Sequence, residues 1–221
     1  MMKDVVIFGM GQIAEVVHYY LTSEGKRNVV AFTVDEAHLK ATELSGLPVV
    51  PFETVEERYP PETHEMFVAV SFRRVNRDRE EKVLAAESKG YALIAHVSPH
   101  ATVWNDFVPQ PNTIIMENNV IQPFVSVGRN VIMWSGNHVG HHTIIEDNCF
   151  IASHAVISGS VRIGEGSFVG VNATIRDNIV IGKRNVLGAG TLILDDTPDE
   201  AVFIGPATPL SRVPSGRLRS L

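Results

Sequence analysis

The chain has 221 residues, of which 44% are hydrophobic and 20% are charged, and its formal net charge is −6. That length suffices for one large or two small domains, and the acidic balance argues against nucleic acid as the main partner. The single cysteine, Cys149, excludes an internal disulfide, and no apolar run approaches the roughly 20 residues of a membrane span, so we expect a cytoplasmic protein without a membrane span.

The first part of the chain alternates short apolar runs with amphipathic segments. We predict strands at residues 4–9, 28–35, 47–52, 66–71 and 91–97, and helices at residues 12–25 and 73–90. Strands that alternate with helices favour a parallel sheet. We therefore predict that residues 1–95 form an α/β, Rossmann-like half domain, because about 95 residues leave no room for a second mononucleotide-binding half.

The second part repeats an aliphatic residue at every sixth position. Fourteen consecutive positions follow this rule: Ile115, Ile121, Val127, Met133, Val139, Ile145, Ile151, Ile157, Ile163, Val169, Ile175, Ile181, Leu187 and Ile193. A helix has a period of 3.6 and an ordinary strand has a period of two, so neither explains the spacing. Glycine, asparagine and aspartate recur after the aliphatic residue and supply turns. The pattern predicts the hexapeptide repeat of a parallel β-helix over residues 96–221, with a C-terminal tail.

A glycine-rich motif at the front, Gly9-Met10-Gly11-Gln12, follows a predicted strand and opens a predicted helix. Backbone N–H groups at a helix N-terminus bind phosphate, so we expect a nucleotide here. NAD remains an alternative, but the short domain favours a single nucleotide, such as that of a nucleotide sugar. The residues that we expect at the same sheet edge, and assign to substrate binding with Gly9, Gly11 and Gln12, are Asp35, Ser71, Asn76 and Arg79.

The whole chain resembles a two-domain branch of the hexapeptide-repeat acyltransferases. The resemblance lies in VIFGMGQIAE at the front, in the repeats from Gly136 to Gly190, and in VFIGPATPLSRV near the end. This branch contains the bacillosamine-pathway amino-sugar N-acetyltransferases and proteins similar to sialic-acid O-acetyltransferases. The resemblance implies a left-handed β-helix in which three hexads form one triangular coil, so that residues eighteen apart stack. It also implies a homotrimer that binds acetyl-CoA between neighbouring β-helices, and the outward Phe150 and Phe168 are compatible with such contacts.

Four histidines, His138, His141, His142 and His154, fall within a short stretch. With eighteen-residue stacking, none of them stacks on another. The resemblance implies that His141 is the general base, which is usually followed by a glutamate; here His142 follows, and it is the alternative base. A histidine with a pKa near its ordinary value of about 6.5 suits proton removal from an amine. Asn137 and His138 remain candidates for orienting His141, because the spacing does not bring the nearest acids to it.

The resemblance also implies an acetyl-CoA site. Gly159 stacks on His141 and offers a backbone N–H to the thioester carbonyl. The other residues that we assign to acetyl-CoA are Lys183 and Arg184, for the phosphates, and the side-chain-poor run Gly188, Ala189 and Gly190.

We therefore expect an acetyl-CoA-dependent N-acetyltransferase that acts on a nucleotide-linked amino sugar. The alternatives are sugar O-acetylation, a non-catalytic sugar-nucleotide-binding subunit, and a zinc-dependent β-helix enzyme, because three histidines can hold a catalytic zinc. We expect no metal.

Overall fold

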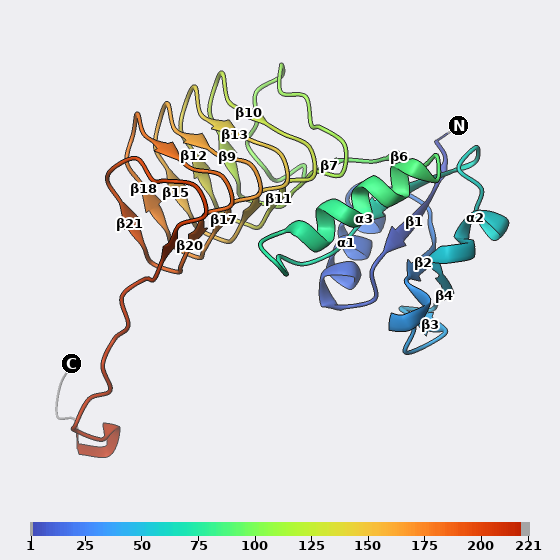
Figure 1. Ribbon diagram of the computed structural model, residues 1–221, viewed down its shortest axis with the longest axis horizontal. Coiled ribbons are helices and arrows are strands. Elements are labelled where there is room, and N and C mark those ends of the chain that lie inside the picture. The colour runs from blue at the N-terminus through green and yellow to red at the C-terminus, as the bar shows by residue number, and fades with distance from the viewer. Residues whose placement is uncertain (1, 218–221) are drawn as a thin grey trace.

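The computed structural model describes residues 2–217 and has two parts, an α/β sheet followed by a β-helix (Figure 1). The N-terminal sheet ends with β6 (Ala92–Leu93), and the β-helix begins with β7 (His96–Val97). Beyond the last coil, an extended tail leads away from the body to the short helix η3 (Ser215–Arg217). None of the helices in residues 2–217 has the length and hydropathy needed to cross a membrane.

The N-terminal sheet has the order β3-β4-β2-β1-β5-β6, and only β3 runs antiparallel to its neighbour. Its further strands are β1 (Asp4–Phe8), β2 (Val29–Val34), β3 (Glu43–Leu44), β4 (Leu47–Pro51) and β5 (His64–Val68). The helices are α1 (Gln12–Ser23), η1 (Glu36–His38), η2 (Phe52–Thr54), α2 (Val55–Arg58) and α3 (Arg77–Ser88). Because β1 lies between β2 and β5, the chain changes direction across the sheet at the carboxyl end of β1, where such sheets bind ligands.

Two predicted boundaries are wrong around residues 66–76. The strand β5 ends at Val68, before Ser71. The helix α3 begins at Arg77 instead of Arg73. The reason is a left-handed turn, in which Arg74, Val75 and Asn76 have φ values of 50°, 53° and 65°. Such values are incompatible with a right-handed helix, so Asn76 precedes α3 as its N-cap.

The β-helix consists of two-residue strands on three parallel sheets, as the six-residue period predicts. One sheet, which we call face 1, has the order β22-β20-β17-β14-β11-β8-β7; face 2 has the order β21-β18-β15-β12-β9; face 3 has the order β10-β13-β16-β19. The strands are β8 (Ile114–Ile115), β9 (Val120–Ile121), β10 (Ser126–Val127), β11 (Ile132–Met133), β12 (His138–Val139), β13 (Ile144–Ile145), β14 (Phe150–Ile151), β15 (Val156–Ile157), β16 (Arg162–Ile163), β17 (Phe168–Val169), β18 (Thr174–Ile175), β19 (Val180–Ile181), β20 (Val186–Leu187), β21 (Leu192–Ile193) and β22 (Val202–Phe203). All fourteen repeat positions point inward and are at most 5% exposed, which confirms the hexapeptide prediction and the left-handed β-helix.

The edges of the prism are tight turns that place asparagine in the left-handed region. Along the edge between faces 3 and 1, Asn112, Asn130 and Asn148 have φ values of 56°, 55° and 63°. Their amides form a buried ladder, in which Nδ2 of Asn112 donates to Oδ1 of Asn130 over 2.8 Å, and Asn130 donates to Asn148 over 2.7 Å. Asparagine tolerates this backbone conformation, and its amide satisfies the next coil, so the ladder fixes the eighteen-residue register.

Face 1 is covered by the N-terminal part of the chain. Ile132 and Phe150 point outward from this face and belong to the same buried cluster as Val17 of α1, and the partly buried Phe168 packs against this cluster. The ring of Phe72 lies 5.3 Å from that of Phe150 and 4.7 Å from that of Phe168. Phe150 and Phe168 are therefore covered within the chain, and the expectation that they are available for trimer contacts is wrong.

Candidate functional site

The glycine-rich motif forms the turn between β1 and α1. Gly9 has a φ of +131°, and a Cβ on it would lie 2.8 Å from the carbonyl oxygen of Ala69. Only glycine therefore fits at this crossing of two strand ends. Gly11 is the N-cap residue of α1, and because it has no side chain, no capping hydrogen bond is made there. The exposed Gly11 and Gln12 consequently leave N–H groups of the first helical turn directed to solvent, where they can bind an anion.

A cleft of about 370 Å³ opens beside this turn. Phe8, Met10 and Val70 form apolar walls, and Asp35 contributes its carboxylate. Nζ of Lys82 lies 2.6 Å from Oδ1 of Asp35, so the pair presents both an acceptor and a cationic donor. The volume and lining suit a nucleoside. Lys82 is a residue that the sequence analysis missed, since nothing in the spacing of α3 distinguishes it from the other charged residues.

Arg79 and Asn76 do not lie in this cleft. Both are fully buried at the junction with the β-helix, where Nη2 of Arg79 donates to the carbonyl oxygens of Asn148 and Cys149 over 2.9 and 3.0 Å. Nδ2 of Asn76 donates to the carbonyl oxygen of Gly166 over 2.9 Å. Burial lowers the pKa of Arg79 to about 10. Because their polar groups are satisfied by the β-helix, neither residue is available to a substrate; Ser71 is half-buried and three residues beyond β5.

His141 and His142 occupy the turn between β12 and β13, on the edge between faces 2 and 3. The backbone N–H of His141 donates to Oε1 of Gln122 over 2.9 Å. Its imidazole lies against Gly159 one coil further on, because a Cβ on Gly159 would lie 2.7 Å from Cε1 and 2.9 Å from Nε2. The absence of a side chain at Gly159 therefore makes the space that the ring of His141 occupies, as the eighteen-residue stacking predicts.

The nearest polar partner of His141 is His142. Nδ1 of His141 lies 3.1 Å from Nδ1 of His142. The acids and amides near it in the sequence are engaged elsewhere: Glu146 pairs with Arg162, Asp147 accepts from the N–H of Arg129, and Asn137 is buried in an amide ladder. None of these residues is therefore in a position to orient His141.

The backbone N–H of Gly159 is left open. One coil earlier, the equivalent N–H of His141 is bound by the side chain nineteen residues before it, Gln122. Nineteen residues before Gly159 is Gly140, which has no side chain, and no acceptor for the Gly159 N–H occurs within residues 2–217. An imidazole and an unpaired N–H thus lie side by side, which is the arrangement that general-base catalysis with oxyanion stabilisation requires.

The other histidines lie apart from this pair. His138 is on β12 in face 2, and the ring of His154 lies over Gly136 on the edge between faces 1 and 2. Across residues 2–217, no group of three His, Cys, Asp or Glu side chains converges as metal ligands.

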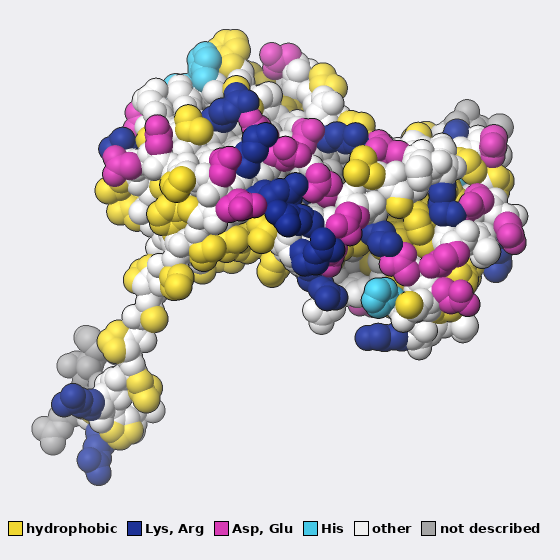
Figure 2. Space-filling model, in the orientation of Figure 1, with side chains coloured by type: hydrophobic (Ala, Val, Ile, Leu, Met, Phe, Trp, Pro, Cys, Tyr) yellow, Lys and Arg dark blue, Asp and Glu magenta, His cyan; other side chains and the backbone are white. Residues whose placement is uncertain are grey.

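The residues assigned to acetyl-CoA fall on three different edges of one β-helix. Gly159 is beside His141, whereas Lys183 and Arg184 are on the edge that carries the asparagine ladder, and Gly188 to Gly190 follow β20 on the third edge. Arg184 pairs with Glu80 of α3 over 2.9 Å, and Lys183 lies 3.7 Å from Glu165. One chain therefore does not bring these groups together, and Arg184 is engaged at the domain junction. Over that junction, basic and acidic side chains are interspersed on the surface (Figure 2).

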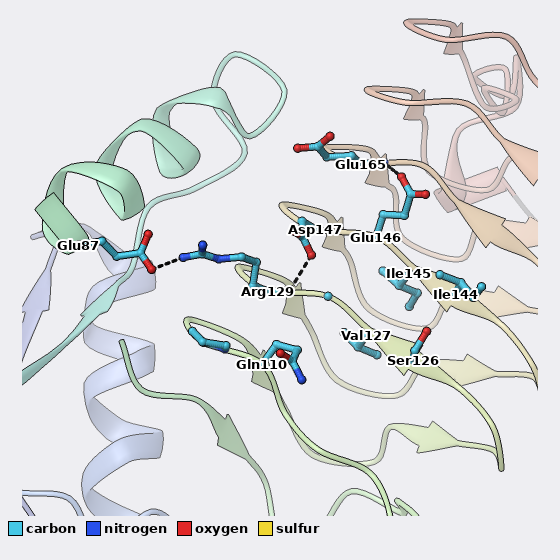
Figure 3. A pocket seen from close by; sticks show the side chains of 12 residues that line it. Glu87, Gln110, Ser126, Val127, Arg129, Ile144, Ile145, Glu146, Asp147 and Glu165 are labelled. Carbon is cyan, nitrogen blue, oxygen red and sulfur yellow. Dashed lines mark hydrogen bonds and ion pairs between the residues drawn. The ribbon is translucent and has the colours of Figure 1, made fainter. Parts of the chain in front are cut away.

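A cleft of about 710 Å³ beside the end of α3 has four acids among its lining residues, including Glu87, Glu146 and Asp147 (Figure 3). These carboxylates serve the fold: Glu87 pairs with Arg129, Oδ1 of Asp147 accepts from the N–H of Arg129 over 3.0 Å, and Glu146 accepts from the N–H of Glu165. None of the residues assigned to catalysis or binding lines this cleft.

The two candidate centres lie on opposite sides of the β-helix. The glycine-rich turn belongs to the part that covers face 1. The turn with His141 joins faces 2 and 3, which is the one edge that does not border face 1. Within a single chain, the solenoid therefore separates the histidine pair from the nucleotide cleft.

Comparisons with known proteins agree with this architecture. A sequence model of the bacterial transferase hexapeptide family (six repeats) matches residues 160–195, and no curated protein sequence matches the chain. A mutant of perosamine N-acetyltransferase from Caulobacter crescentus, in complex with CoA and GDP-perosamine, is 25% identical, with a TM-score of 0.84 over 93% of this chain and 95% of that chain. The acetyltransferase domain of PglB from Neisseria gonorrhoeae is 26% identical, with a TM-score of 0.82 over 95% of this chain and 100% of that chain.

A third structure, WeeI from Acinetobacter baumannii, is 18% identical with a TM-score of 0.78 and shares the fold. The first two matches extend over both the α/β part and the β-helix. Together with the six-residue repeat, they make the chain similar to the hexapeptide-repeat acetyltransferases, and among these to the nucleotide-sugar N-acetyltransferases.

Proposed function

We propose that the protein transfers the acetyl group of acetyl-CoA to the amino group of a nucleotide-linked sugar, with His141 as the general base. The observation that carries this proposal is the imidazole of His141 lying directly against Gly159, whose N–H has no acceptor in the described part of the chain. The similar perosamine N-acetyltransferase was solved with CoA and GDP-perosamine, and the PglB domain was also solved with acetyl coenzyme A.

The mechanism that fits this geometry is direct transfer. Nε2 of His141 removes a proton from the sugar ammonium, and the freed amine attacks the thioester carbonyl carbon. The N–H of Gly159 stabilises the oxygen of the tetrahedral intermediate. Once the C–N bond has formed, the C–S bond breaks and CoA leaves as its thiolate. The nitrogen gives its second proton to this thiolate, so that a neutral amide and the CoA thiol are formed, and His141 returns its proton to solvent. No covalent enzyme intermediate is needed, and Cys149 is fully buried, with burial raising the pKa of its thiol to about 12.

The acceptor's nucleotide binds at the sheet edge. The base and ribose enter the cleft with Asp35 and Lys82, and the diphosphate meets the N–H groups at Gly11 and Gln12. Gly9 contributes by allowing the close approach of the strand ends.

The active site is formed between two copies of the chain in a homotrimer. The histidine pair and the nucleotide cleft of one chain are separated by the solenoid, so the acceptor sugar can reach only the His141 of a neighbour. Face 2 also exposes apolar side chains that suit such an interface: Val120, Val156 and Leu192 are between 39% and 62% exposed and alternate with His138 and Thr174. In this assembly, acetyl-CoA lies between neighbouring β-helices, and Gly188, Ala189 and Gly190 reach it from a second chain.

The test is a thiol-release assay with acetyl-CoA and a panel of UDP-, GDP- and dTDP-linked 3-amino and 4-amino sugars. We expect turnover of one amino sugar, and we expect His141→Ala to abolish it while His154→Ala, on another edge, retains it. Turnover of a hydroxyl sugar alone would instead establish O-acetylation, which the same base can support. Absence of turnover together with binding of a sugar nucleotide would identify a non-catalytic binding subunit.

A further inference from the structure

The two imidazoles of the histidine pair share one hydrogen bond. Their Nδ1 atoms are 3.1 Å apart, and the rings meet edge to face, with centroids 5.2 Å apart and planes at 86°. A neutral imidazole has one protonated and one unprotonated nitrogen. One of the two Nδ1 atoms must therefore donate and the other accept, and the choice determines which nitrogen of His141 is free.

Only one of the two arrangements gives a base. If Nδ1 of His142 donates, His141 carries its proton on Nε2 and has no lone pair there. If Nδ1 of His141 donates, Nε2 has the lone pair, and the Cε1 edge that joins the two nitrogens lies against Gly159, with Nε2 2.9 Å from the position of a Cβ there. When Nε2 then takes up a proton, Nδ1 still donates to His142, so this arrangement persists through the reaction. In the reverse arrangement His141 could take up a proton only on Nδ1, and this would break its hydrogen bond with His142.

His142 is itself held in place from its other side. Its backbone is left-handed, with a φ of 59°, and its N–H donates to the carbonyl oxygen of Pro123 over 3.3 Å. Its ring packs on that of Phe124, with centroids 4.7 Å apart and a tilt of 38°. Phe124 is 70% exposed and lies outside the solenoid core, so its contact with this ring is made at the surface. The order of contacts is thus Phe124, His142, His141 and Gly159.

We propose that His142 is a positioning residue, whose neutral Nδ1 accepts from Nδ1 of His141 and so fixes the tautomer and ring orientation in which Nε2 acts as the base. Phe124 acts through His142 by holding its ring. This inference rests on the proposed function, in which His141 is the base. It gives His142 a role other than that of a second base, because its own Nδ1 lone pair is used by the hydrogen bond.

The test compares His142→Phe with His142→Glu. Phenylalanine keeps a ring to pack on Phe124 but has no acceptor, whereas glutamate restores an acceptor without the ring. We expect His142→Phe to lower kcat by about 10- to 100-fold, as loss of an orienting partner does, with the KM for acetyl-CoA nearly unchanged. His142→Glu should recover most of that loss. The matched control is His154→Phe, at another left-handed edge position with a φ of 60°, which should retain wild-type kcat.

A second measurement does not depend on turnover. Nitrogen-15 NMR of histidine-labelled protein reports the tautomer of His141, with the signal assigned from the His141→Ala variant. We expect a protonated Nδ1 in the wild type and a mixture of tautomers in His142→Phe. A wild-type His141 protonated on Nε2, or kcat equal to that of the wild type in His142→Phe, would overturn the inference. Lack of turnover in the wild type itself would instead remove the proposed function, and the NMR result would still decide the tautomer.

Discussion

Arg79 of α3 and Asn130 of the β-helix are hydrogen bonded across the domain junction, with Nε of Arg79 donating to Oδ1 of Asn130 over 3.0 Å. Asn130 also accepts from Asn112 and donates to Asn148, so the guanidinium is joined to the ladder that sets the register of the coils. Within residues 2–217, the hydrogen-bond partners of this buried cation are carbonyl and amide oxygens, and none is a carboxylate. The junction therefore depends on one side chain that cannot be replaced by a shorter or apolar one.

Arg79→Met should destabilise the protein, because it leaves the carbonyl oxygens of Asn148 and Cys149 buried without this donor. We expect a loss of about 3 kcal/mol in the free energy of unfolding measured in urea. Arg77→Met is the control, since Arg77 is exposed and pairs with Glu200 at the surface, and its loss should cost less than about 0.5 kcal/mol. Equal losses of stability in the two variants would contradict the role of Arg79 at the domain junction.

Glu117 should make the stability depend on acid pH. Burial raises its pKa, but hydrogen bonds from Ser135 and Tyr20 outweigh burial and hold the pKa of Glu117 below its usual value. A depressed pKa in the folded state contributes stability above the unfolded value near 4.5, and this contribution is lost as the pH falls through the folded pKa. Glu117→Gln should therefore lower Tm at pH 7, and the difference from the wild type should shrink below about pH 4.5. A difference that grows on acidification would refute this assignment.

Gly159→Ala should impair catalysis more than stability. Its Cβ would meet the movable ring of His141 at 2.7 Å, so the ring has to shift while the backbone stays. Gly140→Ala is the matched comparison, because its Cβ would meet the backbone nitrogen of Gly159 at 2.5 Å. We expect kcat to fall at least about 10-fold in Gly159→Ala with nearly unchanged Tm, whereas Gly140→Ala should lower Tm by several degrees. Activity and thermal unfolding of both variants decide the point.

The fold was predictable because its determinants are local and repeated. Every sixth residue from Ile115 to Ile193 has to be apolar to enter the core, and a period of six is inconsistent with a helix or an ordinary strand. The failures at Ser71 and Arg73 have a different cause, the left-handed turn at residues 74–76, which ends in Asn76 hydrogen bonded to Gly166 of the β-helix. Val75 is β-branched, and a β-branched residue at this position gives no indication of a positive φ.

The candidate site was only partly predictable, because the repeat relates residues within the β-helix but not residues of different elements. Eighteen-residue stacking relates His141 to Gly159 and His142 to Phe124, and the structure brings both pairs together. No periodicity relates Asp35 to Lys82, or shows that Arg79 turns into the domain junction. Which side chains enter a buried junction depends on how the two domains meet. The spacing of residues within either domain does not encode this.

The separation of the histidine pair from the nucleotide cleft gives the last prediction, which concerns two inactive variants. His141→Ala removes the base, and Gly11→Glu places a negative charge where the diphosphate binds; Gly11 has a φ of −97° and open space at its Cβ, so the second variant should fold.

If each site combines His141 of one chain with the cleft of its neighbour, random co-assembly of the two variants gives about one quarter of the sites both intact groups. Purification through two different tags retains only mixed trimers, and each mixed trimer has both intact groups at one of its three sites, so the purified protein should recover about a third of the wild-type activity per site. The same variants mixed as pre-formed homotrimers serve as the control and should stay inactive. If the co-expressed pair is also inactive although both chains are present, base and nucleotide must belong to the same chain, and a site between subunits is excluded.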